Sequence, residues 1–371
     1  MFSAVMALVL LTSLLIAFAV LSKSEPSIAG NHARSLQARA MAESGVEQAI
    51  WALSSSSVNT GAAPYDGSSF VSVGTIGGFF VTIANGTATN EKVVDAVGWS
   101  PGNSTTGTRN AHRHVRLTLS KIKWLNPPAA LLIEGNVVTS GNAITVSGAA
   151  DTSCGPKNGA VASGSIYTNG TPTILGGGGA APELQNVPPT TMDQYMFTNA
   201  DLNMLKSIAK ANGTYYQGSQ VFNSTNPWPA HGLVFVDTAD GQNLTCTPPG
   251  VGQTCTPAAS DLSTVTIGSG GMPTLNGWLI VNGSIAWSGT ATINGLVYAV
   301  NDIAVSGTPT VNGAVISKNL IDTSSTSIDS TFAGAFTTIT IDYNCANTKN
   351  GGGTIPVGWF IKAGTYREVS D

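Results

Sequence analysis

Along the chain, the apolar and polar positions begin with an almost continuous apolar segment. Residues 2–21 are apolar apart from three hydroxyl side chains, and the first charged residue is Lys23. About 20 apolar residues in a row are enough for a helix to cross a bilayer. Pro26 and Gly30 then weaken the helical pattern. We therefore expect an apolar helix that is softened near Pro26.

An amphipathic pattern follows and extends this helix. Between residues 33 and 53, small or aliphatic side chains recur at helical spacing, while arginine and glutamate occupy the other faces. The pattern stops near Ser54. One continuous helix over residues 1–54 is therefore the expected first segment.

Strand patterns begin after residue 55. From residue 70 to residue 122, apolar and polar side chains alternate, and three glycine-containing dipeptides supply turns. This pattern predicts an antiparallel sheet of three or four strands within residues 55–125, packed on the end of the helix. The sequence Asn126-Pro127-Pro128 then has the composition of a linker.

The strongest internal signal is an 18-residue repeat. Asn-Gly recurs at Asn276, Asn294 and Asn312, and each copy is followed by a short apolar run. A repeat of this length with glycine turns is typical of a β-helix, in which equivalent positions of successive coils stack. An ordinary antiparallel sandwich is the alternative, but it does not explain the recurrence. The positions expected to face the inside are Ile285, Trp287, Ile293, Ile303, Val305 and Val311.

The β-rich segment of residues 126–371 contains one helical pattern. Leucine and alanine at helical spacing predict a short helix near residues 199–211, capped by Thr198 or Asn199 and ended by Gly213. The expected fold class is therefore α+β. It combines a long N-terminal helix, a small antiparallel sheet and a solenoid-like β-rich head.

Composition narrows the range of functions. Only 10% of the residues are charged and the formal net charge is −4, which is too little basic charge for a nucleic-acid-binding surface. A cytosolic enzyme of this size normally has about a quarter of its residues charged. Low charge with 43 glycines is more typical of a secreted repeat protein.

The four cysteines fit an extracellular protein with disulfides. Cys246 and Cys255 flank a segment with turn-forming residues, so we expect a local bridge between them. Cys154 and Cys345 are then the remaining pair. Four free thiols are the alternative. Zinc binding is disfavoured because no CxxC pair or nearby histidine accompanies these cysteines.

Candidate catalytic and metal-binding motifs are weak. No HExxH, GxSxG or phosphate-binding loop occurs, so we expect no cofactor. His112 and His114 lie on one face of an expected strand, which would permit a metal pair, but two exposed strand residues are the favoured interpretation. The segment Asp237–Asn243 faintly resembles a calcium loop, yet it lacks the terminal glutamate, and a turn is favoured.

Seven Asn-x-Ser/Thr sequons make glycosylation an option. In a chain this rich in asparagine, serine and threonine, many sequons arise by chance. Their asparagines are Asn85, Asn103, Asn169, Asn212, Asn223, Asn243 and Asn282.

The sequence AMAESGVEQAIWAL, from Ala40 to Leu53, resembles the N-terminal helix of PilX-type type IV pilin-like proteins. The resemblance implies processing by a prepilin peptidase, a precursor pool in the inner membrane and later extraction into a filament. Many type IV pilins carry a glutamate at mature position five, whereas this chain has Val5, and its first acid is Glu25. The residues that would form the assembly helix are Phe2, Val5, Leu8, Leu11, Leu14, Leu15, Phe18, Leu21 and Pro26.

A cleaved signal peptide and a simple membrane anchor are alternative interpretations of the same helix. The signal peptide is disfavoured, because no basic segment precedes the apolar run and an amphipathic helix follows it directly. The simple membrane anchor stays open as the less favoured alternative.

The expected function is that of a non-enzymatic structural subunit of an extracellular filament. It would polymerise with itself and with other pilins, expose its head and bind no nucleic acid. One alternative is a minor or tip pilin that acts as an adhesin, for a surface or glycan ligand, or as an assembly initiator. A second is a membrane-anchored β-helix enzyme acting on carbohydrates. The repeat region from 276 to 320 offers that chemistry only Asp302, Lys318 and little else.

Overall fold

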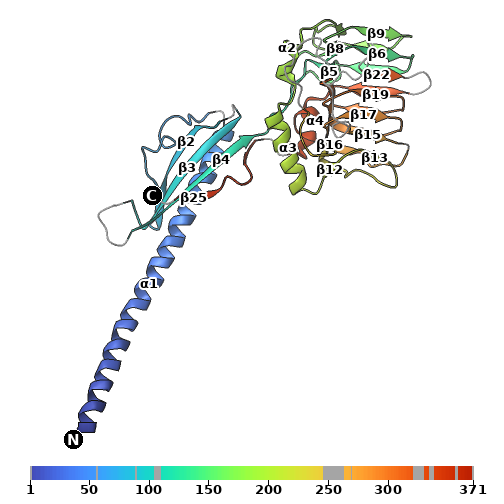
Figure 1. The fold of residues 1–371 in the computed structure, drawn as a ribbon. Helices are drawn as coiled ribbons and strands as arrows, with labels where there is room; N and C mark the ends of the chain where they lie inside the picture. Colours follow the sequence, from blue (N-terminus) through green and yellow to red (C-terminus); the bar gives the residue numbers. More distant parts are fainter. Residues whose placement is uncertain are drawn as a thin grey trace. The chain divides into compact units, whose positions relative to one another are not determined.

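The chain folds into two compact units, one of Met1–Lys121 with Gly358–Asp371 and the other of Ile122–Val357 (Figure 1). The residues that the computed structural model describes are 2–55, 57–87, 90–103, 110–244, 263–268, 270–320, 330–333, 338–355 and 358–369.

The first unit is a helix packed on an antiparallel sheet. Helix α1 (Phe2–Ser54) runs through Pro26 as one element. Strand order is β1-β2-β3-β4, and two short C-terminal strands both pair with β4. The strands are β1 (Val71–Val73), β2 (Gly77–Asn85), β3 (Glu91–Ser100), β4 (Ala111–Lys121), β24 (Trp359–Ile361) and β25 (Arg367–Val369).

The C-terminal part of α1 is the part that packs on the sheet. Ala42, Val46 and Ala49 are buried in one apolar cluster with side chains of β2, β3 and β4. Gly98 in β3 permits this close approach, because a Cβ there would collide with the backbone of Ala38 and Ala42. Small residues on both elements therefore bring the helix against the sheet.

The C-terminal strands correct the expected domain boundary. The sequence pattern assigned residues 126–371 to the head, but β24 and β25 belong to the first unit. Trp359 Nε1 donates to the carbonyl of Leu53 at 3.0 Å, and the Tyr366 hydroxyl donates to Glu43 Oε1 at 2.9 Å. Each strand has only three residues, which is too short to show an alternating pattern.

The second unit is a stack of parallel strands in two sheets (Figure 1). The larger sheet has two faces, because its strand Thr292–Ala299 pairs with one strand through its first residues and with another through its last, so the stack has three faces. Apart from an isolated antiparallel bridge between Lys157 and Gly177, every strand pair described in this unit is parallel. This arrangement is that of a β-solenoid and not of an antiparallel sandwich. One face holds β12 (Tyr215–Gln217), β14 (His231–Asp237), β16 (Leu275–Val281), β18 (Thr292–Ala299), β21 (Ala314–Ser317), β5 (Ala129–Ile133), β8 (Asn158–Ala162) and β11 (Glu183–Leu184).

The other two faces are formed by shorter strands, of three or four residues each. The second holds β13 (Gln220–Phe222), β15 (Thr264–Ile267), β17 (Ser284–Trp287), β19 (Ile303–Val305), β22 (Ser330–Ala333), β6 (Val137–Ser140) and β9 (Ile166–Asn169). The third holds β20 (Thr310–Asn312), β23 (Ile339–Asp342), β7 (Ile144–Ser147) and β10 (Thr173–Leu175).

The register of the stack follows the 18-residue repeat. Asn276 pairs with Asn294 across neighbouring strands, and the side chains form an amide ladder. Asn294 Nδ2 donates to Asn276 Oδ1, and Asn312 Nδ2 donates to Asn294 Oδ1, both at 2.8 Å. The next residue in each copy must be glycine, because a Cβ at Gly295 would collide with the carbonyl of Gly277. The side chains of Ile285, Trp287, Ile293, Ile303, Val305 and Val311 are at most 3% exposed.

The coils do not stack in chain order. The chain starts in the middle of the stack with β5 and adds β8 and β11 toward one end. It then passes through α3 (Asn199–Ala211) to the opposite end and returns through β14, β16, β18 and β21. Strand β21 pairs with β5, so the last coils close against the first, with Val315 opposite Leu131.

The helices of the second unit are short. Helix α3 has a capping box, in which Thr198 accepts from the Asp201 amide and the Asp201 carboxylate accepts from the Thr198 amide. Gly213 follows the helix with φ +68°. The helix therefore has the expected bounds. The other helical elements among the described residues are α2 (Pro189–Met192), α4 (Cys345–Asn350) and the 3₁₀ turns η1 (Asp193–Tyr195) and η3 (Gly351–Gly353).

Candidate functional site

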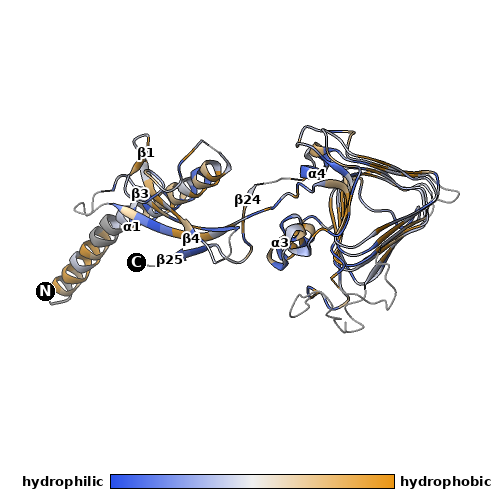
Figure 2. Ribbon diagram, turned by 90° about the horizontal axis from the view of Figure 1, so that it is seen from above, coloured by the Kyte–Doolittle hydropathy of each residue, from blue (hydrophilic) through white to orange (hydrophobic). Residues whose placement is uncertain are grey.

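The most unusual surface of the chain is the N-terminal part of α1. Its described large apolar side chains are mostly solvent-exposed, and Figure 2 colours these turns largely as hydrophobic. Exposed apolar patches of this kind mark interaction surfaces in soluble proteins. The expected assembly residues Val5, Leu8, Leu11, Leu14, Leu15 and Phe18 are 58–65% exposed.

Large apolar side chains are exposed on the other sides of this part of the helix as well. Met6, Val9, Leu10 and Ile16 are 60–65% exposed as well, so no single face of this stretch is polar. The side chains of Phe2 and Leu21 lie outside the described part. We name the described apolar residues from Val5 to Phe18 the apolar stretch.

No described helix combines the length and the apolarity that crossing a bilayer requires.

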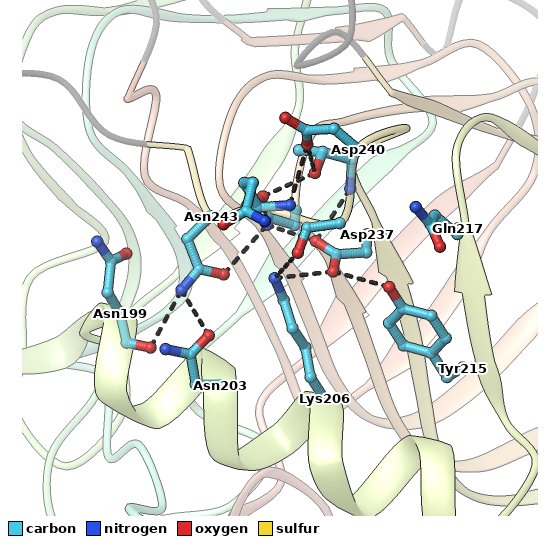
Figure 3. Close-up of polar contacts among 12 residues, drawn as sticks. Asn199, Asn203, Lys206, Tyr215, Gln217, Asp237, Asp240 and Asn243 are labelled. Carbon is cyan, nitrogen blue, oxygen red and sulfur yellow. Dashed lines mark hydrogen bonds and ion pairs between the residues drawn. The ribbon is translucent and has the colours of Figure 1, made fainter.

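A second candidate site is a buried polar cluster between α3 and the end of β14 (Figure 3). Lys206 Nζ lies 2.7 Å from Asp237 Oδ2, and the two side chains are 8% and 0% exposed. Lys206 Nζ also donates to the carbonyl of Gly241 at 3.1 Å. Residue 206 lies on the helix face that buries Leu202 and Leu205, and a lysine on an apolar face is the sequence signal that could have found this site.

Four donors surround the Asp237 carboxylate. Oδ1 accepts from the Thr238 amide at 3.0 Å and from Asn282 Nδ2 at 2.7 Å. Oδ2 accepts from Lys206 and from the Tyr215 hydroxyl at 3.0 Å. Burial raises the pKa of Tyr215 to about 12, and the hydrogen bond to the carboxylate adds to the shift. The phenol therefore keeps its proton at neutral pH.

The loop after β14 is a turn that is fixed by its own side chains. Asp240 Oδ1 accepts from the Thr238 hydroxyl at 2.8 Å and from the Gln242 amide at 2.9 Å. These bonds, the amide of Gln242 foremost, lower the pKa of Asp240. Asn243 Nδ2 donates to the carbonyl of Asn199 and to Asn203 Oδ1 on α3. Within the described ranges, no group of three or more His, Cys, Asp or Glu side chains could hold a metal ion.

The two strand histidines have separate partners. His114 Nε2 lies 3.0 Å from Asp95 Oδ1, which also accepts from Arg116 Nε at 2.6 Å. The His112 ring packs against the Trp99 ring, with the ring centroids 4.7 Å apart and the planes tilted by 31°. Both histidines therefore take part in contacts between β3 and β4.

The expected disulfide between Cys154 and Cys345 is present, with Cα atoms 5.7 Å apart. It joins the loop before β8 to the start of α4. The Cys345 amide also donates to Asp151 Oδ2 at 2.8 Å, so a hydrogen bond supports the same connection. The expected bridge between Cys246 and Cys255 lies outside the described residues.

The sequons differ in accessibility. Asn282 is fully buried and bound to Asp237, so its sequon is closed to a glycosyltransferase in the folded protein. This finding corrects the expectation for that position. Asn223 and Asn243 are half-buried, whereas the exposed members are Asn85, Asn103, Asn169 and Asn212.

Comparison with known proteins gives little further information. No family model matches the chain, and no curated protein matches it. A solved structure, the competence-associated pilin ComZ from Thermus thermophilus, is similar at a TM-score of 0.24 and 11% identity, over 90% of this chain and 97% of that chain.

Proposed function

We propose that the chain is a structural subunit of an extracellular, type IV pilus-like filament of the PilX type. It would polymerise through the apolar stretch of α1, together with other pilins, and expose its β-rich head at the cell surface. The observation that carries this proposal is the division of one helix, whose C-terminal part is buried on a sheet while its N-terminal part exposes ten large apolar side chains, from Val5 to Phe18.

Association through this stretch has a clear driving force. Apolar surface removed from water stabilises the associated state by about 25 cal/mol per Å². A helix that projects from its own unit can contact different patches on several neighbours. Contacts of this heterologous kind do not close, and they lead to open helical polymers.

The head suits a structural role. Its solenoid buries most of its large apolar residues, and the amide ladder and the disulfide hold neighbouring coils together. We propose no enzymatic activity, because the buried acid Asp237 is engaged by Lys206 and three further donors.

Electron microscopy of the native cell surface with an antibody against the head tests the proposal. Label along whole filaments is the expected result. Label spread over the cell envelope, with no filament, would contradict a filament subunit.

A minor or tip subunit that acts as an adhesin or assembly initiator is the second candidate. The large second unit, Ile122–Val357, favours it, because it gives the head a wide surface for a ligand. Label only at filament tips in the same experiment would select this candidate. A membrane-anchored enzyme acting on carbohydrates is the third, and turnover of acidic or neutral glycans by the purified full chain would reveal it.

A further inference from the structure

The buried pair of Lys206 and Asp237 has the geometry of a reaction site as well as that of an ion pair. The nucleophilic Nζ lies 2.7 Å from Oδ2, and both side chains are almost completely removed from water (Figure 3). Lys206 Nζ is also held by the carbonyl of Gly241 and lies 5.9 Å from the ring centroid of Phe235. The amine therefore has a fixed position beside the carboxyl group.

The two carboxyl oxygens have different surroundings. Oδ1 receives two hydrogen bonds, from the Thr238 amide and from Asn282 Nδ2. Two donors aimed at one oxygen form the arrangement that stabilises the oxyanion of a tetrahedral intermediate. Oδ2 receives the Tyr215 hydroxyl and the amine. Oδ2 is therefore the oxygen that can be protonated and leave.

We propose that Lys206 and Asp237 become joined after folding by an intramolecular isopeptide bond, with Tyr215 as the proton relay. Nζ attacks Cγ of Asp237, and the new bond joins these two atoms. The bond between Cγ and Oδ2 breaks, and Oδ2 leaves as water.

The step balances without a further reactant. The ammonium group of Lys206 has three protons, of which one stays on the amide nitrogen and two leave with Oδ2. Tyr215 donates its hydroxyl proton to Oδ2 and regains a proton from Nζ. The positive charge of the lysine and the negative charge of the aspartate disappear together.

Burial favours this outcome. The two side chains of the pair are 8% and 0% exposed, and taking two charges out of water is costly even when they are paired. An amide leaves no charge in the site. The donors to Oδ1 remain paired, because the amide oxygen accepts the same two hydrogen bonds.

The bond would fasten α3 to the solenoid. It would close a loop from Lys206 to Asp237, and cross-links of this kind stabilise a fold mainly by restricting the unfolded chain. The disulfide between Cys154 and Cys345 constrains a different part of the same unit. A filament subunit exposed to pulling forces would gain from both constraints.

Mass spectrometry of the reduced full-length protein tests the proposal directly. The expected result is a mass lower by one water than that of the unmodified chain, and a proteolytic digest that yields one branched peptide linking Lys206 to Asp237. A full mass and two separate peptides would overturn the proposal and leave a buried ion pair.

Lys206→Arg is the matched variant, because it keeps the positive charge but removes the reactive amine. Its mass should equal that of the unmodified chain, and a water loss that persists in this variant would overturn the assignment to Lys206. If Lys206→Arg does not fold, Tyr215→Phe keeps all the reacting atoms. The bond should then form about 100-fold more slowly after refolding, and an unchanged rate would overturn the relay role of Tyr215.

Discussion

Cys154 and Cys345 are separated by 191 positions in the sequence, yet a disulfide joins them with their Cα atoms 5.7 Å apart. Cys154 belongs to the first coils of the solenoid and Cys345 follows the last. Because the last coils pair with the first in the middle of the stack, this bond spans the place where the two halves of the solenoid meet.

Removal of this disulfide should lower the stability of the head markedly. Replacing both Cys154 and Cys345 with serine should reduce the free energy of unfolding by about 2–5 kcal/mol, because a long loop in the unfolded chain is no longer closed. Denaturant unfolding of the full chain measures the effect. Asp151→Ala is the control, because it removes the hydrogen bond to the Cys345 amide and keeps the disulfide, and its effect should be smaller. Equal effects would contradict the argument from loop length.

Neighbouring positions of one strand should differ greatly in their sensitivity to the same substitution. Ile303 is 1% exposed, whereas Ala304 points outward from the solenoid. Ile303→Asp places an unpaired charge inside and should cost about 3 kcal/mol or more, which is enough to prevent secretion of folded protein. Ala304→Asp should change the free energy of unfolding by less than about 0.5 kcal/mol. Secretion yield and unfolding midpoints measure both, and a folded Ile303→Asp protein would refute the inward assignment.

The amide ladder should show a graded response. The Asn294 side chain makes two ladder bonds, since it accepts from Asn312 and donates to Asn276. The Asn312 side chain makes one, to Asn294. Asn294→Ala should therefore cost about 1–2 kcal/mol and Asn312→Ala about half as much, since each lost bond between partly buried groups has a similar cost. Thermal unfolding compares the two variants. A larger loss in Asn312→Ala would contradict the pairing.

Local patterns predicted much of this fold. The 18-residue repeat predicts that Asn276 and Asn294 stack, and they pair in neighbouring strands. Thr198 was one of the two residues expected to cap α3, and it is the N-cap. The order of the coils could not be predicted, because β21 could pair equally well with any coil of similar pattern. The contact between Val315 and Leu131 depends on long-range packing.

The buried polar site was harder to find than the core. Asp237 appeared in the sequence only as part of a turn, and Lys206 only as one residue of a helix. Their pairing follows from the path of the chain, which brings α3 against β14. The apolar stretch of α1 was visible at once, because its pattern is local.

Glu134 should make the stability of the head depend on pH. Burial raises the pKa of its carboxyl group from 4.5 to about 7, and nearby Lys318 opposes the shift. Between these two values the native protein binds more protons than the unfolded chain, so its stability falls as the pH rises through this window. Glu134→Gln should remove that fall and be more stable above about pH 7, by on the order of 1 kcal/mol. Unfolding midpoints of both proteins at about pH 5 and about pH 8 measure the difference, and parallel profiles would rule out this origin.

The apolar stretch should be needed for assembly but not for folding. Leu14 is 58% exposed and touches no part of the sheet core, so Leu14→Lys should leave the thermal unfolding of both units unchanged. In a filament the same lysine would be buried among apolar neighbours, at a cost of several kcal/mol, and filaments should not form. Leu175→Lys is the matched control, because Leu175 is 46% exposed on the solenoid and its replacement should leave assembly intact. Electron microscopy of cells that produce each variant measures assembly. Filaments built from Leu14→Lys would contradict helix-driven polymerisation, and loss of filaments in both variants would point to a general effect of added charge.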